Sequence, residues 1–292
     1  IEIDPGAGFC FGVEEVIKTA EMRLRDGETL YGLGDMVHNA AEVKRLQQLG
    51  LKTIDHEQLG RLPSGKVLFR AHGEPPQTYE TAKEHGVEVI DGTCHIVAKL
   101  QEKLKKAYET MDRSTEQMVI YGKPDHPETI GLLGQVNGDA LVLSSVEEVS
   151  SVDPQKKVLL FSQTTMDPEH FKEVENALKE YLQKNTGDKE YLHFRSDCTI
   201  CGQMKKRKPG LSNFARNYDV MLFVSGKNSS NGRMLYEYCK SLNPATHCIS
   251  SKEEVKKEWF DSCESIGISG ATSTSRAQLE SVMEEVKKLT SS

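Results

Sequence analysis

The sequence predicts an α/β protein made of three related α/β domains. Short apolar or β-branched runs alternate with longer segments of helical periodicity, which is typical of parallel sheets covered by helices. Several short runs, such as Val220–Val224, are apolar throughout, as expected for strands buried on both faces. The same order of polar turns occurs three times, so the 292 residues divide into three units, although this length alone suggests about two domains.

The elements can be placed in order along the chain. Nine short runs are predicted as strands: Thr29–Tyr31, Val67–Arg70, Val87–Ile90, Met118–Tyr121, Ala140–Leu143, Val158–Phe161, Tyr191–Phe194, Val220–Val224 and Ile266–Ser269. Six segments have the apolar spacing of helices: Val13–Leu24, Ala40–Leu49, Val97–Met111, Pro168–Gln183, Arg233–Ser241 and Ala277–Leu289. Gly50, Gly86 and Gly187 stand where a helix would end, because the left-handed residue after a helix favours glycine.

Three kinds of polar turn recur in the same order along the chain. The first kind carries a cysteine, in Pro5–Cys10, Asp91–Cys94 and Asp197–Cys201. The second contains His38-Asn39, then His126-Pro127, then Ser230-Asn231. The third contains Ala71-His72, then Gln163–Thr165, then Ala271–Ser273. Because ligands of parallel α/β sheets bind beyond the carboxyl ends of the strands, we expect the nine turns to converge on one site about a pseudo-threefold axis.

Composition limits the partners of the chain. Lys and Arg number 37 and Asp and Glu number 44, so the net charge is −7, and we expect no binding to nucleic acid or to a membrane surface. No apolar run approaches the roughly 20 residues that span a bilayer. No signal peptide is evident, so we expect a cytoplasmic protein whose seven cysteines serve thiol, metal or cluster chemistry and not a disulfide framework.

Three of the cysteine positions are equivalent in the repeat. They are Cys10, Cys94 and one of Cys198 and Cys201. Three thiolates leave a fourth position open, which suits an iron–sulfur cluster with one free iron or a catalytic metal with an exchangeable ligand. Soft thiolates favour the cluster over a hard cation. The segment Cys198–Cys201 also fits a redox dithiol, although no thioredoxin-like pattern surrounds it.

Histidine, serine and asparagine side chains in the turns are candidate ligands of an anion. His38, His72 and His126 occupy turns at predicted strand ends, and Ser229, Ser230, Asn231 and Ser273 are neutral donors of the same kind. Helped by helix N-termini, such donors can hold phosphate oxygens without a large basic patch. The sequence therefore predicts a site for a compact polyanion, which agrees with the negative net charge.

A carboxyl group and two hydroxyl groups are candidates for proton transfer. Glu128 follows His126 by two residues, so it is either a partner of a helix N-terminus or a proton donor beside a metal centre. Thr164 and Thr165 could relay a proton or cap the helix that is predicted to start near Asp167.

Seven segments together resemble the motifs of the 4-hydroxy-3-methylbut-2-enyl diphosphate reductase family. Members of this family catalyse the last step of the methylerythritol phosphate route to isoprenoids. The seven segments are Gly8–Val13, Val37–Asn39, Ala71–Gly73, Asp91–Cys94, His126–Glu128, Gln163–Thr165 and Lys227–Asn231. The resemblance runs in order from about Phe9 to Ser273 and so covers nearly the whole chain.

The resemblance implies a trefoil of three α/β domains around a central [4Fe–4S] cluster. One cluster per chain would be held by Cys10, Cys94 and Cys201, with one iron open to the substrate. Cys201 is preferred to Cys198 because Thr199–Cys201 resembles the family segment. We expect the domains to span residues 1–94, 95–192 and 193–276, and residues 277–292 to form a C-terminal helix and tail that pack back on the body.

The resemblance also implies the reaction and the residues that perform it. The diphosphate contacts map onto His38, His72, His126, Ser229, Ser230, Asn231 and Ser273, with Thr164 beside the substrate. The proton donor maps onto Glu128. The implied reaction is a two-electron, proton-coupled reductive dehydroxylation that gives isopentenyl diphosphate and dimethylallyl diphosphate. Reduced ferredoxin or flavodoxin would supply the electrons.

Two other functions use the same residues. One is a metal-dependent phosphate-ester hydrolase that binds zinc or iron through the three thiolates, and the other is a non-catalytic diphosphate or redox sensor. The basic segment Lys205–Pro209 is interpreted as a solvated loop, and a docking site for an acidic electron carrier is the alternative.

Overall fold

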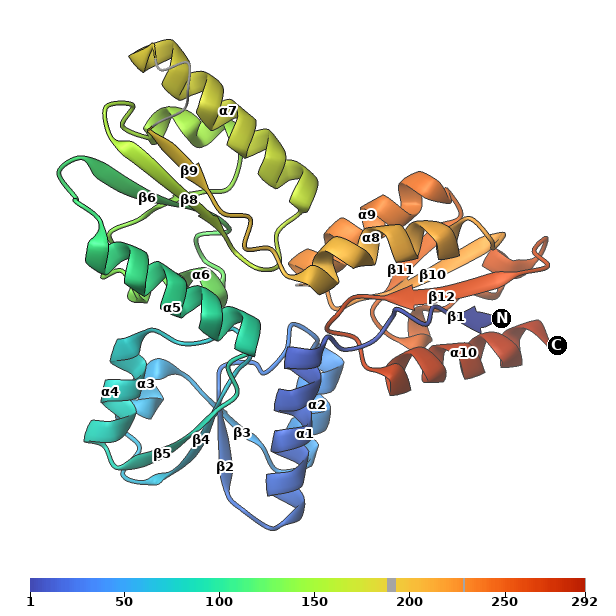
Figure 1. Ribbon diagram of the computed structural model, residues 1–292. Coiled ribbons are helices and arrows are strands. Elements are labelled where there is room, and N and C mark those ends of the chain that lie inside the picture. The colour runs from blue at the N-terminus through green and yellow to red at the C-terminus, as the bar shows by residue number, and fades with distance from the viewer. Residues whose placement is uncertain (188–192, 228, 292) are drawn as a thin grey trace. The chain divides into compact units, whose positions relative to one another are not determined.

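The computed structural model describes residues 1–187, 193–227 and 229–291, and the side chain of Ser230 lies outside this description (Figure 1). The chain falls into two units. The first consists of Ile1–Leu59, Gly65–Arg70 and Lys206–Ser292, and the second consists of Gly60–Ser64 and Ala71–Lys205. The described strands form sheets in which the paired strands of each unit are parallel, so the predicted α/β class is confirmed. The predicted domain boundaries remain predictions.

The strands of the first unit belong to two different sheets. One sheet has the order β1-β12-β10-β11, and in another sheet β2 lies between β3 and β4. The strands are β1 (Glu2–Ile3), β2 (Leu30–Leu33), β3 (Lys52–Ile54), β4 (Gly65–Phe69), β10 (Val220–Val224), β11 (Thr246–Ile249) and β12 (Ile266–Gly270). The helices are α1 (Phe11–Arg25), α2 (Ala40–Gln48), α3 (His56–Leu59), α9 (Ser230–Leu242) and α10 (Arg276–Thr290), with short 3₁₀ turns at Lys252–Glu254 and Lys257–Phe260.

The second unit contains a sheet of order β7-β6-β8-β9. The strands of this unit are β5 (Val87–Asp91), β6 (Glu116–Tyr121), β7 (Leu141–Leu143), β8 (Lys157–Ser162) and β9 (Phe194–Ser196). Its helices are α4 (Pro76–Glu84), α5 (His95–Thr110), α6 (Pro127–Gly134) and α7 (Pro168–Thr186), with a 3₁₀ turn at Val146–Ser151. Helix α8 (Gly202–Ala215) begins in the second unit and continues into the first.

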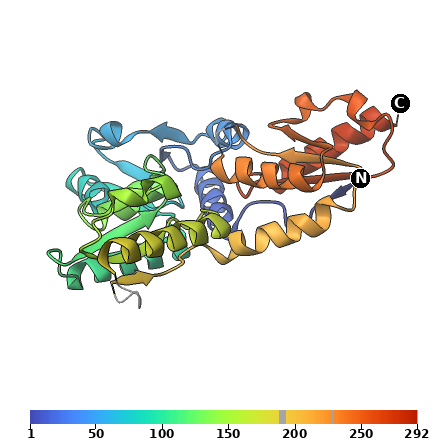
Figure 2. The ribbon, with the colours of Figure 1, turned by 90° about the horizontal axis from the view of Figure 1, so that it is seen from above.

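Helices cover both faces of the β10 sheet, as the apolar composition of β10 predicts. Met221 and Phe223 pack with residues of α8 and α9, whereas Val220, Leu222 and Val224 pack with residues of α10. Figure 1 shows α8 and α9 on one face and α10 on the other. Helix α10 also contacts β1, and the two termini lie at the same edge of this unit (Figures 1 and 2).

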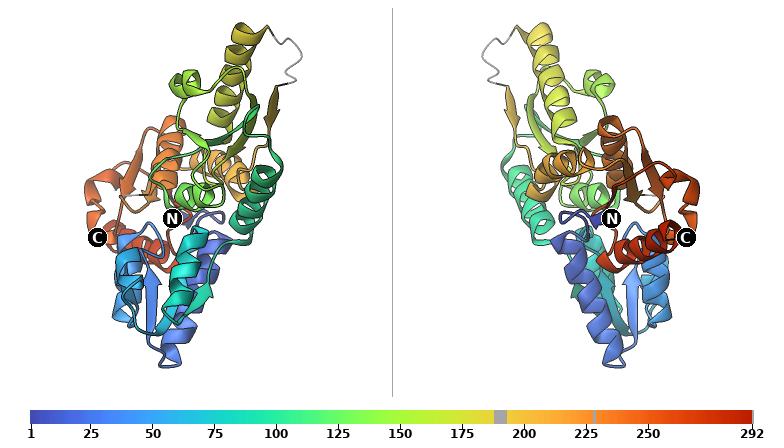
Figure 3. Two further views of the ribbon diagram at one scale, coloured as in Figure 1. Left: turned by 90° about the vertical axis from the view of Figure 1, so that its left-hand side faces the viewer. Right: turned by 90° about the vertical axis from the view of Figure 1, so that its right-hand side faces the viewer.

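The sheet of the second unit is layered in the same way. Met118 and Ile120 of β6 pack with apolar residues of α5 and α6. On the other face, the Tyr121 ring lies 6.1 Å from the Phe171 ring of α7, and this helix runs along the sheet (Figure 3). Among the described residues, no helix combines the length and the apolar character that crossing a membrane requires.

All nine predicted polar turns follow a strand and lead toward a helix. The cysteine turns follow β1, β5 and β9, and the other turns follow β2, β4, β6, β8, β10 and β12. In each case the turn therefore lies at the carboxyl end of a strand, which is the end where parallel α/β sheets bind their ligands.

Several elements differ from the sequence-based expectation. The strands β1, β3 and β11 and the helices α3, α4, α6 and α8 were not predicted. The expected strand Tyr191–Phe194 begins only at Phe194 in the described residues, since 191 and 192 lie outside them. The interpretation of Lys205–Pro209 as a solvated loop is wrong, because these residues belong to α8 and Arg207 is buried.

Candidate functional site

Two of the three candidate cysteine ligands lie in the second unit, each just before a helix. Cys94 is the N-cap residue of α5, and its N–H group donates to the carbonyl oxygen of Ala71 at 3.0 Å. Cys201 directly precedes α8, and its N–H group donates to the carbonyl oxygen of Thr164 at 2.8 Å. Both thiols are half-buried, whereas the nearby Cys198 is exposed.

Burial raises the pKa of the Cys94 thiol. The N–H groups of Ile96 and Val97, at the start of α5, oppose this shift, and the Cys201 thiol and the Glu128 carboxyl add to it. The two thiols are therefore close enough to interact electrostatically. A bound metal centre would remove the cost of the charged thiolate, because it compensates the negative charge that burial disfavours.

The loop that carries Cys201 is tied to the end of β8. The hydroxyl of Thr199 donates to the carbonyl oxygen of Ser162 at 2.5 Å and accepts from the Ser162 N–H group at 2.9 Å. The N–H group of Asp197 donates to Leu160, and the Asp197 carboxylate pairs with Lys103 of α5. Sequence reasoning missed Thr199 as a site residue, because a threonine at a strand end carries no distinguishing signal.

Glu128 is a carboxyl group that is almost completely buried. It lies in the first turn of α6 and is 1% exposed. Its Oε1 accepts from the Thr164 N–H group at 2.6 Å, and its Oε2 accepts from the Thr164 hydroxyl at 2.9 Å. Burial raises the pKa of Glu128 to about 7, although the two hydrogen bonds from Thr164 oppose the shift. The carboxyl can therefore both hold and release a proton near neutral pH.

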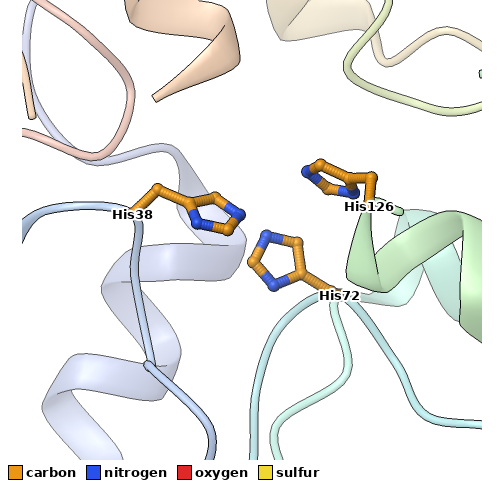
Figure 4. Close-up of side chains that lie close together, drawn as sticks. All are labelled: His38, His72 and His126. Carbon is orange, nitrogen blue, oxygen red and sulfur yellow. The ribbon is translucent and has the colours of Figure 1, made fainter. Parts of the chain in front are cut away.

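His126 begins the same helix and is oriented by it. As the N-cap residue of α6, it accepts the Glu128 N–H group on Nδ1 at 3.1 Å. In the neutral imidazole this bond places the hydrogen on Nε2, which is then a donor. The His72 ring meets the His126 ring edge-on, with centroids 5.2 Å apart (Figure 4). His38, which Figure 4 also labels, belongs to the first unit.

Gln163 braces the turns of the second unit. Its Oε1 accepts from the Lys123 N–H group at 3.1 Å and from the Thr129 hydroxyl at 3.2 Å, and its Nε2 donates to the Thr165 hydroxyl at 2.6 Å. The sequence placed Gln163 in a motif but gave it no role. The helix cap that was considered for Thr164 or Thr165 is supplied by Asp167, which accepts from the Glu169 N–H group.

The third candidate cysteine lies in the first unit. Cys10 is the N-cap residue of α1, and its N–H group donates to the carbonyl oxygen of Thr272 at 3.1 Å. The Cys10 turn is thus attached to the turn that follows β12. All three candidate cysteines consequently share one local setting, the residue immediately before a helix.

The hydroxyl and amide candidates of the first unit come together in pairs. The Ser273 hydroxyl donates to the Ser229 hydroxyl at 3.4 Å, and Ser229 also caps α9 by accepting from Gly232 at 3.0 Å. The Asn231 amide donates to the Thr272 hydroxyl at 2.5 Å. Ser230 is the first residue of α9, and its side chain lies outside the described residues.

His38 lies in the turn after β2, next to the turn after β10. A side chain at Gly226 would place its Cβ 2.5 Å from the His38 carbonyl oxygen, so the close approach of these turns requires glycine. Burial lowers the pKa of His38, Arg70 lowers it further, and Asp35 opposes the shift. The imidazole is therefore neutral at neutral pH and has one N–H group to donate.

Asn39 links the His38 turn to the Ser273 turn. Its side chain caps α2 by accepting from Ala41 at 3.1 Å and donates to the carbonyl oxygen of Ser273 at 3.0 Å. It also donates to Gln278 at 2.8 Å. Sequence reasoning did not select Asn39, and its place beside His38 was the only signal that could have found it.

The geometry of each unit brings part of the predicted set together. The second unit joins Cys94, Cys201, Glu128, Thr164, His72 and His126. The first unit joins Cys10, His38, Ser229, Asn231 and Ser273 through the turns after β1, β2, β10 and β12.

Comparison with known proteins assigns the chain to a family. The family model described as LytB protein matches residues 1–287. A protein of Bacteroides fragilis named 4-hydroxy-3-methylbut-2-enyl diphosphate reductase is 45% identical over 287 residues, which cover 98% of this chain and 97% of the relative. A protein of Porphyromonas gingivalis with the same name is 44% identical and covers 99% of both chains.

Two solved structures have the same fold. The structure described as (E)-4-hydroxy-3-methyl-but-2-enyl diphosphate reductase, the terminal enzyme of the non-mevalonate pathway, superposes with a TM-score of 0.73 at 33% identity over 99% of both chains. A Plasmodium falciparum reductase superposes with a TM-score of 0.82 at 23% identity over 98% of this chain and 86% of its own, which supports the fold alone. The chain therefore belongs to the LytB protein family of 4-hydroxy-3-methylbut-2-enyl diphosphate reductases and is an oxidoreductase.

Proposed function

We propose that this chain reduces 4-hydroxy-3-methylbut-2-enyl diphosphate to isopentenyl diphosphate and dimethylallyl diphosphate with a [4Fe–4S] cluster. The observation that carries the proposal is the full-length similarity to relatives that are named for this activity. The geometry that supports it most directly is the buried Glu128 carboxyl, whose raised pKa suits a proton donor.

The cysteines fit a cluster with three protein ligands. The donor set is all thiol, as is usual for [4Fe–4S] clusters, and Cys94 and Cys201 lie within electrostatic reach of each other. Cys201 is also joined to Thr164 through its main chain, whereas Cys198 is exposed. We assign Cys10, Cys94 and Cys201 as the ligands. When bound, the cluster would supply electrons one at a time and a Lewis-acidic iron for the allylic hydroxyl.

Glu128 and Thr164 deliver one of the two protons that the reductive dehydroxylation consumes. The protonated carboxyl of Glu128 donates to the Thr164 hydroxyl, which passes a proton to the substrate and is recharged from the carboxyl. The observed distance of 2.9 Å between Oε2 and the hydroxyl oxygen is short enough for this transfer. Because Glu128 is 1% exposed, bulk water does not compete for the proton.

The diphosphate is held by neutral donors and by helix N-termini. His126 offers its Nε2–H group, neutral His38 offers one N–H group, and Ser229 stands at the start of α9. His72, Ser230 and Ser273 complete the hydroxyl and imidazole donors. In the described residues Asn231 Oδ1 is buried without a hydrogen-bond partner. Rotating this amide would let Thr272 donate to Oδ1 and would free the N–H donors for the anion.

Iron and sulfide analysis of anaerobically purified protein tests the cofactor. We expect about four iron and four sulfide per chain, as the cluster stoichiometry requires. Cys10→Ser, Cys94→Ser and Cys201→Ser should each lose the cluster. Cys198→Ser is the matched control and should keep it. Colourless protein that holds only zinc would contradict the proposal and favour a hydrolase. A variant pattern in which Cys198 and not Cys201 is required would overturn the ligand assignment.

We propose that reduced ferredoxin or flavodoxin supplies the electrons and that the enzyme works in the cytoplasm. Turnover with each purified carrier, compared with a chemical reductant, tests the first of these. A carrier that reduces the cluster as fast as the chemical reductant would support it, and the absence of any transfer from both carriers would contradict it.

A further inference from the structure

A buried ion pair of the first unit involves none of the candidate residues. Arg207 of α8 is 6% exposed and Asp4 is 3% exposed, and Arg207 Nη1 donates to Asp4 Oδ2 at 2.7 Å. Ser269, which is fully buried, closes a triangle. It accepts from Arg207 Nη2 at 2.7 Å and donates to Asp4 Oδ2 at 2.8 Å. Each of these hydrogen bonds involves a charged group and is therefore stronger than a neutral one.

Asp4 shapes the loop that leads to Cys10. Its Oδ1 accepts from the Gly6 N–H group at 2.8 Å, and its carbonyl oxygen accepts from the Ala7 N–H group at 2.9 Å. A Cβ at Gly6 would lie 3.2 Å from Arg207 Nη1, so the loop packs directly against the guanidinium. The conformation of the Cys10 loop therefore depends on the position of Arg207.

The same guanidinium holds the end of β12. Arg207 Nη2 also donates to the carbonyl oxygen of Gly270, the last residue of β12, at 3.2 Å. The next residues form the turn in which Thr272 accepts from the Cys10 N–H group and Ser273 contacts Ser229. One side chain thus joins the segments that carry a proposed cluster ligand and a proposed diphosphate ligand.

The third segment is α8 itself. This helix begins directly after Cys201, and Arg207 lies on it six residues beyond that cysteine. Met204 and Leu211, at helical spacing from Arg207, are buried with it. These three residues lie on the buried face of α8, and Arg207 makes the polar contacts of that face. The contacts therefore fix the rotation of α8 about its axis.

Apolar residues of similar volume could hold these segments at lower cost, because burying two charges carries a large desolvation penalty. The ion pair instead fixes the relative orientation of these segments, since the planar guanidinium donates hydrogen bonds to three partners in a fixed geometry. We propose that Arg207, with Asp4, is a positioning residue of the iron–sulfur centre, which orders the Cys10 loop and α8 before the cluster binds. This inference rests on the proposed function.

Three variants test the role of Arg207. In Arg207→Met and Asp4→Asn, one partner of the network loses its charge, and we expect the cluster to be lost in air roughly 10-fold faster than in the wild type, as for other residues that orient metal ligands. Arg207→Lys keeps the charge but cannot bond Asp4, Ser269 and Gly270 together, so its cluster should have an intermediate lifetime. The measurements are iron and sulfide per chain after anaerobic reconstitution and the half-life of the visible absorption in air.

A double variant separates positioning from stability. Asp4→Leu with Arg207→Met removes both charges, so its apoprotein should recover the melting temperature that the single variants lose. It still lacks the carboxylate that holds Gly6, so its cluster should remain short-lived. The double variant also carries the test if the single variants fail to fold. Glu42→Leu with Arg45→Met is the matched control, because it removes another ion pair of the first unit and should keep the wild-type cluster.

The outcomes distinguish this inference from the proposed function. Wild-type protein that binds no cluster would contradict both. If the wild type is loaded and the double variant shows the wild-type melting temperature, iron content and cluster lifetime, Arg207 is structural only and the inference alone is overturned. Loss of cluster lifetime in the double variant, with a recovered melting temperature and an unaffected control, is the predicted result.

Discussion

Glu128 lies where its protonated form is favoured, and this determines what its replacement should do. Glu128→Gln keeps the size of the side chain and can keep both contacts with Thr164, but it has no proton to transfer. We expect turnover to fall by a factor on the order of 10² or more while substrate affinity is retained. Steady-state kinetics and equilibrium binding of the diphosphate measure the two quantities. Glu42→Gln, another buried carboxyl, is the control and should leave turnover unchanged.

The raised pKa of Glu128 also makes stability depend on pH. Between pH 4.5 and about 7 the native state keeps a proton that the unfolded state releases, so the free energy of unfolding falls as pH rises through this window. A shift from 4.5 to about 7 corresponds to about 3 kcal/mol.

Glu128→Gln removes this dependence and should therefore stabilise the protein at high pH relative to the wild type. The difference in melting temperature between the variant and the wild type should therefore depend on pH. We expect this difference, variant minus wild type, to increase by roughly 5–10 °C between pH 5 and pH 8. Thermal unfolding of both proteins across this range measures the difference. A constant difference would show that Glu128 is ionised in the native state throughout.

At the scale of elements, the loop between β9 and α8 determines where Cys201 lies. Thr199→Val keeps the shape of the side chain but deprives the buried Ser162 N–H group of its acceptor. We expect the melting temperature to fall by a few degrees and the cluster to be retained less well, because an unpaired buried N–H group costs about 1–3 kcal/mol. Thr110→Val, which removes a hydroxyl that bonds within α5, is the control. Equal cluster retention in the two variants would contradict the role of the loop.

Elements with a strong local signal could be predicted, and those without one could not. The run Val220–Val224 is apolar throughout and forms β10 as predicted. The strands β3 and β11 are short and mix polar with apolar residues, so no period marks them. Helix α8 contains Gly202, Pro209 and Gly210, which oppose a helix prediction because glycine and proline have the lowest helix propensities.

The candidate site also has a part that local sequence patterns predict and a part that they do not. The repeat of polar turns places the candidate residues between the end of a strand and the first turn of the next helix, because strand–turn–helix order can be read from the sequence. The partners that hold those turns could not be found in this way. Arg207 stands among lysines in the sequence, and only the fold brings Asp4 and Ser269 to it. Long-range contacts of this kind leave no local pattern.

At the scale of the molecule, each unit holds an incomplete set of the residues that the proposed reaction needs. The first unit carries one of the proposed cluster ligands and most of the hydroxyl donors, whereas the second carries two cluster ligands and the proton donor. The proposed reaction therefore needs residues of both units. With the proposed diphosphate ligands, an acidic chain of net charge −7 can take an anionic substrate, because neutral donors and helix N-termini in the turns would replace a basic surface.

Analysis of the reaction products tests the proposed reductive dehydroxylation. Anaerobic enzyme is incubated with 4-hydroxy-3-methylbut-2-enyl diphosphate and a chemical reductant, and the products are separated and identified. We expect isopentenyl diphosphate and dimethylallyl diphosphate, with no product when the reductant is omitted. Release of inorganic phosphate without reductant would indicate a hydrolase. A substrate that is bound but unchanged by the reduced, cluster-loaded protein would indicate a sensor. Either result would rule out the proposed reductase activity.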